Sequence, residues 1–182
     1  MRIDEEHMTL LTNWSERMDC RGWFVSEKFD GCRAFWDGEN LWTRGGHRIR
    51  APRWFTATLP AGFRLDGEIW AGRGRLERAS NAVRNGHFTR AIRYQVFDAP
   101  LVAGSWDVRL AEAGRALRRA TNAGTVMFGV IRSFDDLQIR FHRVHGRMGE
   151  GIVLRNPAVN TYETGRTKNA VRVKRDPYWG YL

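Results

Sequence analysis

The stretch VSEKFDGCRAFWDG (residues 25–38) combines the end of one predicted strand with the start of a predicted hairpin, and Lys28 lies at the junction. Lysine is scarce in this chain: Lys28, Lys168 and Lys174 are its three lysines, and arginine supplies the remaining 27 of the 30 Lys and Arg residues. Arginine stays protonated at any biological pH, whereas lysine can lose its proton and attack as a nucleophile. Lys28 is therefore a candidate nucleophile. The alternative reading of the Lys-x-Asp-Gly-x-Arg pattern is a turn that carries a surface ion pair.

Length and charge define the class of protein. The 182 residues predict one compact domain over residues 1–182 that is large enough for its own hydrophobic core. The formal net charge is +10 and the sequence pI is about 10.7. Such a basic balance favours a polyanionic partner, most simply a nucleic acid. The alternative is a solvated surface that is rich in arginine for reasons unrelated to binding.

Cysteine content and the first residues indicate the compartment. Two cysteines, Cys20 and Cys32, are too few for a disulfide framework and have no zinc-ligand spacing. The opening MRIDEEHMTLLTNW lacks the apolar segment of a signal peptide, and no stretch approaches the roughly 18 apolar residues of a membrane span. We expect a reducing, cytoplasmic location, or the cytoplasm of an infected host cell if the chain is viral.

Hydrophobic periodicity predicts an α+β fold of antiparallel sheets flanked by helices. Helices are expected at residues 5–19, 105–120 and 133–146, with Ser105 and Ser133 as N-caps of the last two. A hairpin is expected at residues 33–44, around a turn of Asp, Gly, Glu and Asn. The other predicted strands cover residues 22–28, 63–70, 91–97, 125–131, 151–155 and 170–174.

Carboxylates recur where the predicted strands begin or end. Asp66 and Glu68 alternate in LDGEIW and therefore share one face of a strand, and Glu150 directly precedes GIVLR. Carboxylates from separate strand ends can hold Mg²⁺ together with substrate phosphates. Phe97 ends AIRYQVF and can stack on a purine, or simply pack in the core. Asp66 is more readily a structural than a catalytic residue, and the role of Asp98 stays open.

Several stretches in order along the chain together resemble a known family. They are SEKFDGCRAFWDG, LWTRGG, RAPRWF, LDGEIWAGRGR, VFDAP, EGIVLR and GRTKNAVRVK, and they extend over residues 23–175. In these stretches the chain resembles the adenylylation domain shared by ATP-dependent DNA ligases, RNA ligases and mRNA capping enzymes. Within that group it is most similar to the minimal bacterial ATP-dependent DNA ligases called ligase E. The resemblance implies an ATP-grasp-like nucleotidyltransferase fold and an enzyme that seals nicked DNA in replication, repair and recombination.

The resemblance also assigns roles to residues of this chain. It implies that Lys28 attacks the α-phosphorus of ATP and carries AMP in a covalent bond, with Mg²⁺ or Mn²⁺ as the metal. Glu68 and Glu150 would bind this metal. The nucleotide-binding residues would be Glu27 beside the adenine, Arg33 and Arg44 on ribose or phosphate, Glu68 on the ribose, Phe97 stacked on the adenine, and Arg172 and Lys174 on the α-phosphate. The family usually has lysine at both of the last two positions, so Arg172 departs from its pattern.

Other features bear on the polynucleotide partner. Arg73 and Arg75 lie in the glycine-rich loop of residues 71–78, where they would contact the nucleic-acid backbone or simply be solvated. The stretches WAGRGR and VFDAP favour DNA over RNA as the substrate. NAD-dependent ligases bind nicotinamide with a domain that precedes the nucleophilic lysine. Only 27 residues precede Lys28, which is too few for such a domain, so we expect ATP to be the donor.

In the ligases that the chain resembles, an OB-fold domain normally follows the last strand, and we expect this chain to lack one because few residues follow Lys174. Three functions then compete. The chain is a complete monomeric ligase, an adenylylation subunit that needs a separate OB-type partner, or a nick-binding protein that no longer ligates. An RNA ligase and a capping enzyme are the alternatives among enzymes. We expect an active DNA ligase because the motifs are intact.

Overall fold

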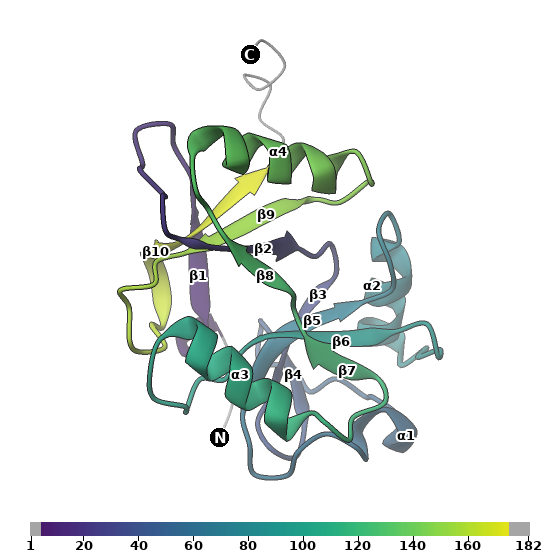
Figure 1. Ribbon diagram of the computed structural model, residues 1–182. Coiled ribbons are helices and arrows are strands. Elements are labelled where there is room, and N and C mark those ends of the chain that lie inside the picture. The colour runs from purple at the N-terminus through teal and green to yellow at the C-terminus, as the bar shows by residue number, and fades with distance from the viewer. Residues whose placement is uncertain (1–4, 175–182) are drawn as a thin grey trace.

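The computed structural model describes residues 5–174, and its described part is built on two five-stranded sheets (Figure 1). In an order that places hydrogen-bonded neighbours side by side, the strands of the first sheet are β1 (Thr9–Asn13), β10 (Gly165–Lys174), β9 (Gly151–Arg155), β2 (Phe24–Lys28) and β8 (Phe128–Val130). The second contains β4 (Leu41–Thr43), β3 (Cys32–Trp36), β5 (Leu65–Trp70), β6 (Arg93–Asp98) and β7 (Ala123–Thr125).

The helices cover the two sheets separately. Helix α4 (Phe134–His145) packs on β9 of the first sheet, whereas α2 (Leu76–Asn85) and α3 (Trp106–Ala116) pack on the second (Figure 1). The remaining helical elements are the short η1 (Glu5–His7) and α1 (Arg53–Thr56). Within residues 5–174, no helix has both the length and the apolar character needed to cross a membrane.

Each sheet has its own buried core because each carries apolar side chains toward its helices. Leu137 and Phe141 of α4 are buried against Leu154 and Val171 of the first sheet. The core of the second sheet is larger and includes Tyr94, which is fully buried and donates its hydroxyl to the carbonyls of two neighbouring strands. Two separately packed halves leave the faces between the sheets available for a site.

The α+β prediction is confirmed, and most strand pairs are antiparallel as expected. The hairpin over residues 33–44 forms as β3 and β4. Two pairs are parallel instead, namely β1 with β10 and β6 with β7. Ser133 caps α4 by accepting a hydrogen bond from the Asp136 amide at 3.1 Å. Ser105 occupies the N-cap of α3, but its hydroxyl bonds to the Asp107 carboxylate instead of a backbone amide.

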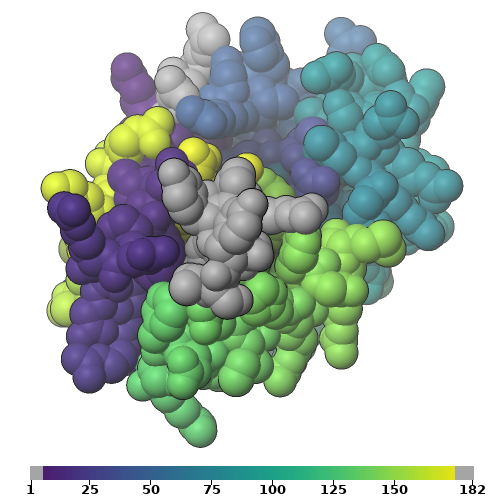
Figure 2. All heavy atoms as spheres, turned by 90° about the horizontal axis from the view of Figure 1, so that it is seen from above, coloured from purple at the N-terminus to yellow at the C-terminus, as the bar shows by residue number. Residues whose placement is uncertain are grey.

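The helix predicted over residues 5–19 is wrong. Only the short η1 is helical there, and the chain continues as β1, which pairs with β10 from Thr9 opposite Gly165 to Asn13 opposite Arg172. The space-filling view shows the same neighbourhood, with the first described residues in purple beside the last in yellow (Figure 2). The reason is tertiary: a partner more than 150 residues away decides the conformation, and local periodicity carries no trace of it.

Two further predictions need correction. The single buried strand over residues 125–131 is in fact β7 and β8, which belong to different sheets, because the chain crosses between the sheets at Val126 and Met127. Phe128 and Val130 are consequently exposed instead of buried. The glycine-rich loop over residues 71–78 ends earlier than expected, since α2 begins at Leu76.

Candidate active site

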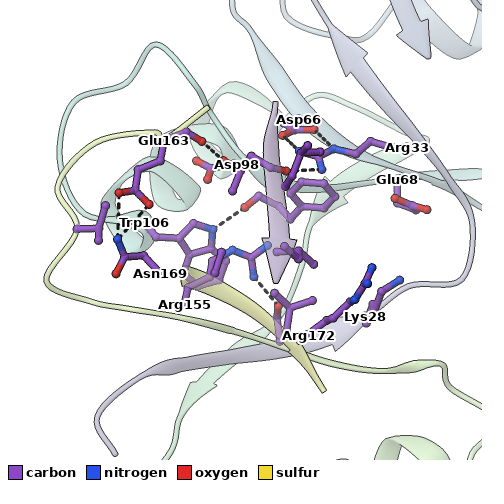
Figure 3. A pocket seen from close by; sticks show the side chains of 18 of the residues that line it. Lys28, Arg33, Asp66, Glu68, Asp98, Trp106, Arg155, Glu163, Asn169 and Arg172 are labelled. Carbon is purple, nitrogen blue, oxygen red and sulfur yellow. Dashed lines mark hydrogen bonds and ion pairs between the residues drawn. The ribbon is translucent and has the colours of Figure 1, made fainter. Parts of the chain in front are cut away.

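A cavity of about 250 Å³ lies between the two sheets and is lined by residues of both. Figure 3 shows Lys28 and Glu68 at one end of this cavity and Glu163 and Asn169 at the other, with Arg155 between them. The sequence-predicted site residues that line it are Glu27, Lys28, Arg33, Arg44, Glu68, Phe97 and Arg172. The structure thus brings together residues from five separate stretches of the sequence.

Lys28 ends β2, where its amine donates a short hydrogen bond to Oε2 of Glu150. The other oxygen of Glu150 is 2.5 Å from the amine of Lys174, so one carboxylate joins both lysines. Partial burial alone would raise the pKa of Glu150, but hydrogen bonds from Lys174 and Lys28 outweigh it and the pKa is lowered. Glu150 is therefore held as an anion between two cations, and it fixes the position of the Lys28 amine.

Glu68 lies on β5, on the opposite sheet from Glu150, and feels the charges of both Lys28 and Glu150. Burial raises the pKa of Glu68 to about 8, although Lys28 and Arg33 act in the opposite direction. Two acidic side chains from different sheets therefore act on the Lys28 amine, Glu150 by direct contact and Glu68 through its proximity. Among residues 5–174, no group of three or more His, Cys, Asp or Glu side chains could hold a metal ion. A divalent cation at Glu68 and Glu150 would therefore need phosphate or water oxygens as its other ligands.

The raised pKa of Glu68 predicts a pH dependence of stability. Between its ordinary value of 4.5 and about 8, the folded state retains a proton that the unfolded state has released, so stability falls as pH rises through this range. Glu68→Gln should remove this dependence and stabilise the protein at pH 8.5 by about 2 kcal/mol. Urea unfolding of both proteins at pH 5 and pH 8.5 checks this. If the unfolding free energies of the unchanged protein and of Glu68→Gln changed equally between the two pH values, the prediction would be contradicted.

Arg33 and Asp66 form a buried ion pair beneath the cavity. The guanidinium donates to both oxygens of Asp66, at 2.9 and 2.5 Å, and to the carbonyl of Thr9 at 2.7 Å. Tyr162 donates to the same carboxylate at 2.5 Å and accepts from the Thr9 amide at 3.0 Å. Asp66 is fully buried. This network ties β3 and β5 of the second sheet to β1 of the first, which gives Asp66 a structural role.

Replacement of Asp66 by alanine should leave the Arg33 guanidinium buried without its carboxylate. We expect a loss of about 3–5 kcal/mol in unfolding free energy, because breaking a buried ion pair from one side strands the other charge. Tyr162→Phe removes the hydrogen bond to the same carboxylate and the one from the Thr9 amide, and should cost only about 1–2 kcal/mol. Denaturant titration of the two variants beside the unchanged protein measures both. If both variants lost a similar amount of unfolding free energy, the Arg33–Asp66 ion pair would contribute no more to stability than the hydrogen bonds of Tyr162.

Two guanidinium groups lie close to the ring of Phe97. The Cζ atom of Arg33 lies 5.1 Å from the ring centroid and that of Arg155 lies 5.7 Å from it. Arg155 also lies 4.5 Å over the ring of Trp106 and donates to Oγ of Ser26 at 3.0 Å. Burial lowers the pKa of Arg155 to about 10. The cavity therefore contains an aromatic face for a planar group and several cations for an anion.

The remaining sequence-predicted residues lie around this centre. Arg172 hydrogen-bonds to Asn13 at 2.7 Å, and Arg44 is an exposed residue at the cavity wall. Arg73 is not a cavity-lining residue, but it forms an ion pair with Glu27, which is one. Arg75 is exposed at the start of α2.

Sequence reasoning missed three residues that shape the site. Arg155 ends the motif EGIVLR and could have been suspected from its place in it. Trp106 lies in the helix predicted over residues 105–120, and it lines the cavity and donates to the Phe97 carbonyl at 2.7 Å. Tyr162 lies in a loop before β10, and nothing in its sequence neighbourhood indicates that it reaches Asp66.

Comparisons with known proteins identify the family of the chain. No family model matches the chain. It is 31% identical over 169 residues to the DNA ligase of Haemophilus influenzae, covering 91% of this chain but 62% of that ligase. The chain thus spans less than two thirds of this curated relative.

Solved structures give the same picture. A structure from a structure–function study of Lig E DNA ligases matches with a TM-score of 0.82 and 30% identity, covering 92% of this chain and 68% of that one. The Chlorella virus DNA ligase-adenylate matches with a TM-score of 0.76 at 20% identity, covering 92% and 66% of the two chains. This second likeness shows the fold alone. On the first of these matches, the chain belongs to the DNA ligase family, and its described residues have the fold of that family's nucleotidyltransferase domain.

Proposed function

We propose that this chain is an ATP-dependent DNA ligase that transfers AMP from ATP to Lys28 and then uses the adenylate to seal nicked duplex DNA. The observation that carries the proposal is the position of the Lys28 amine. It lies at the end of a strand, in hydrogen-bond contact with Glu150, in a cavity that also contains Phe97 and several cations.

In the first step the Lys28 ammonium loses a proton to solvent, and its nitrogen then forms a bond to the α-phosphorus while the bond to the leaving pyrophosphate breaks. A second proton leaves the nitrogen as the phosphoramidate forms, and the released pyrophosphate or water takes it up. Glu150 orients the amine through the hydrogen bond described above. Arg172 and Lys174 lie on β10 and would neutralise the α-phosphate, since charge stabilisation and in-line positioning are the main needs of phosphoryl transfer. Mg²⁺ or Mn²⁺ held by Glu68 and Glu150 would supply further charge neutralisation.

The nucleotide would be held by residues of both sheets. Phe97 presents its ring to the cavity for stacking on the adenine, and Glu27 lies at the cavity wall beside Lys28. Arg33 and Arg44 are the candidate contacts to ribose or phosphate, with Glu68 as a second ribose contact. Arg33 is already fixed by Asp66, so it can offer a pre-oriented donor without a further loss of side-chain entropy.

The polynucleotide is proposed to be nicked DNA, which the net charge of +10 favours. Arg75 and Arg73 are candidate contacts to its phosphates. The chain covers 62% of the related Haemophilus influenzae ligase, so sealing by this chain as a monomer and sealing with a separate OB-type protein are both tested below.

The test uses the purified chain with Mg²⁺ and ATP labelled at the α-phosphate, followed by a nicked DNA duplex. A labelled protein and a sealed strand support the full proposal. Labelled protein without sealing supports an adenylylation subunit that needs a partner. If neither the labelled protein nor the sealed strand forms, the remaining function is that of a nick-binding protein. GTP in place of ATP, and a nicked RNA duplex in place of DNA, test the capping-enzyme and RNA-ligase alternatives.

A further inference from the structure

One ion pair joins the two sheets next to the nucleophile. Arg73, in the loop after β5, donates Nε to Oε1 of Glu27 at 2.8 Å and Nη2 to Oε2 at 2.6 Å. Glu27 is the residue before Lys28 on β2. The two side chains are 32% and 17% exposed, so the pair is partly shielded from water. Two parallel hydrogen bonds of this kind fix the orientation of both groups.

The loop is shaped to direct Arg73 toward β2. Gly72 and Gly74 on either side of it have φ values of +110° and +66°, which glycine adopts without strain. Two residues before Gly72, the ring of Trp70 packs edge-on against Phe29, which directly follows β2 of the other sheet, with centroids 5.0 Å apart. The turn therefore begins at a fixed contact between the sheets and delivers the guanidinium to Glu27.

On its other side, Glu27 lies against the turn that precedes Glu150. A Cβ atom built at Gly149 would be 3.4 Å from Oε1 of Glu27 and 2.4 Å from a methyl group of Val144. The carboxylate of Glu27 is thus enclosed between the Arg73 guanidinium and the Gly149 backbone. Two of the three chain segments that meet here continue directly into a residue of the proposed reaction centre, because Lys28 follows Glu27 and Glu150 follows Gly149. The third segment, the loop of Arg73, follows the strand β5 that carries Glu68.

We propose that Arg73 is a positioning residue. Through its ion pair with Glu27, Arg73 holds the neighbouring Lys28 against Glu150. The proposal rests on the proposed function and adds a residue that lies outside the cavity lining. Arg73 also neutralises Glu27. Without it, an unpaired carboxylate beside Lys28 would repel the phosphates of ATP. Both effects act on the first step, before any nucleic acid binds.

This role differs measurably from a contact to DNA phosphates, which the sequence also suggests for Arg73. A phosphate contact would act only when DNA is present and would contribute about one unit to the salt dependence of DNA binding. A positioning residue changes the rate of AMP transfer to Lys28 in the absence of DNA. AMP transfer without DNA is therefore the decisive measurement.

The experiment compares Arg73→Gln, Glu27→Gln and the double variant, with single-turnover AMP transfer measured without DNA. Arg21→Gln is the matched control, because Arg21 forms the same kind of forked ion pair with Asp19 on an exposed surface. We expect each single variant to transfer AMP about tenfold more slowly, and the double variant to be no slower than Arg73→Gln. Arg21→Gln should match the unchanged protein. Arg73→Lys should recover part of the rate, since it restores charge without the fork.

The outcomes separate the two proposals. An unchanged rate in Arg73→Gln overturns the positioning role alone, as does a double variant whose loss is the product of the single losses. A larger fall in the maximal rate than in the apparent affinity for ATP supports positioning of the amine over a general loss of the cavity. If the unchanged protein transfers no AMP to Lys28, the proposed function fails and the positioning role fails with it.

Discussion

Lys28→Arg is expected to abolish formation of the protein–AMP adduct. Arginine keeps the positive charge and can keep the ion pair with Glu150, but it stays protonated and cannot attack the α-phosphorus. The loss should exceed about a thousandfold in the rate of AMP transfer, because the covalent intermediate has no other route. Intact-protein mass spectrometry after incubation with ATP and Mg²⁺ measures the increase of one AMP directly.

The same variant provides its own control. Because the net charge is unchanged, its affinity for nicked DNA should stay within about twofold of the original, which a gel-shift titration can establish. A persisting mass increase of one AMP in Lys28→Arg would show that another side chain is the nucleophile, and the assignment of the reaction centre would then be wrong.

Glu150→Gln should have the second largest effect. Glutamine preserves the shape of the side chain but removes the charge that both Lys28 and Lys174 contact, together with one of the two proposed metal ligands. We expect AMP transfer to slow by about a hundredfold or more. Single-turnover kinetics at saturating ATP and Mg²⁺ measure this rate.

A charge-matched control comes from α3. Glu112 makes an ion pair with Arg115 on the helix surface, and Glu112→Gln should leave AMP transfer unchanged. If Glu150→Gln slowed the reaction no more than this control does, the link between Glu150 and the reacting amine would be refuted.

The sequence predicted the strands of the site better than their neighbours. Strands β2, β3, β5, β6 and β9 carry alternating or continuous apolar residues, and this local pattern is what places Lys28, Glu68 and Phe97 at the cavity. The roles of Glu150 and Lys174 came from the family resemblance. Neither residue is in the cavity lining, but Glu150 contacts the amines of both Lys28 and Lys174. Lys28 and Lys174 end their strands and Glu150 directly precedes β9, whereas Glu68 lies within β5 on the face that its alternating pattern predicts.

The parts that the sequence could not predict depend on contacts between distant segments. The partner of Glu27 could not be found by pattern, because Arg73 is 46 residues away in a loop. The same holds for Tyr162, which reaches Asp66 from 96 residues away. The conformation of β1 was mispredicted for a related reason, since its pairing with β10 is set by the tertiary fold.

The pairing of β1 with β10 also bears on how the protein is made. During synthesis β1 leaves the ribosome early and has no strand beside it until Gly165–Lys174 has followed, because β10 is its neighbour in the sheet. Contacts between residues so far apart in the sequence form late in folding and lower the folding rate. Thr9, whose carbonyl holds the Arg33 guanidinium, is placed by this pairing and by its hydrogen bond to Tyr162, which also comes late in the chain. A nascent chain should therefore gain its affinity for ATP abruptly, when β10 emerges, and not in proportion to its length.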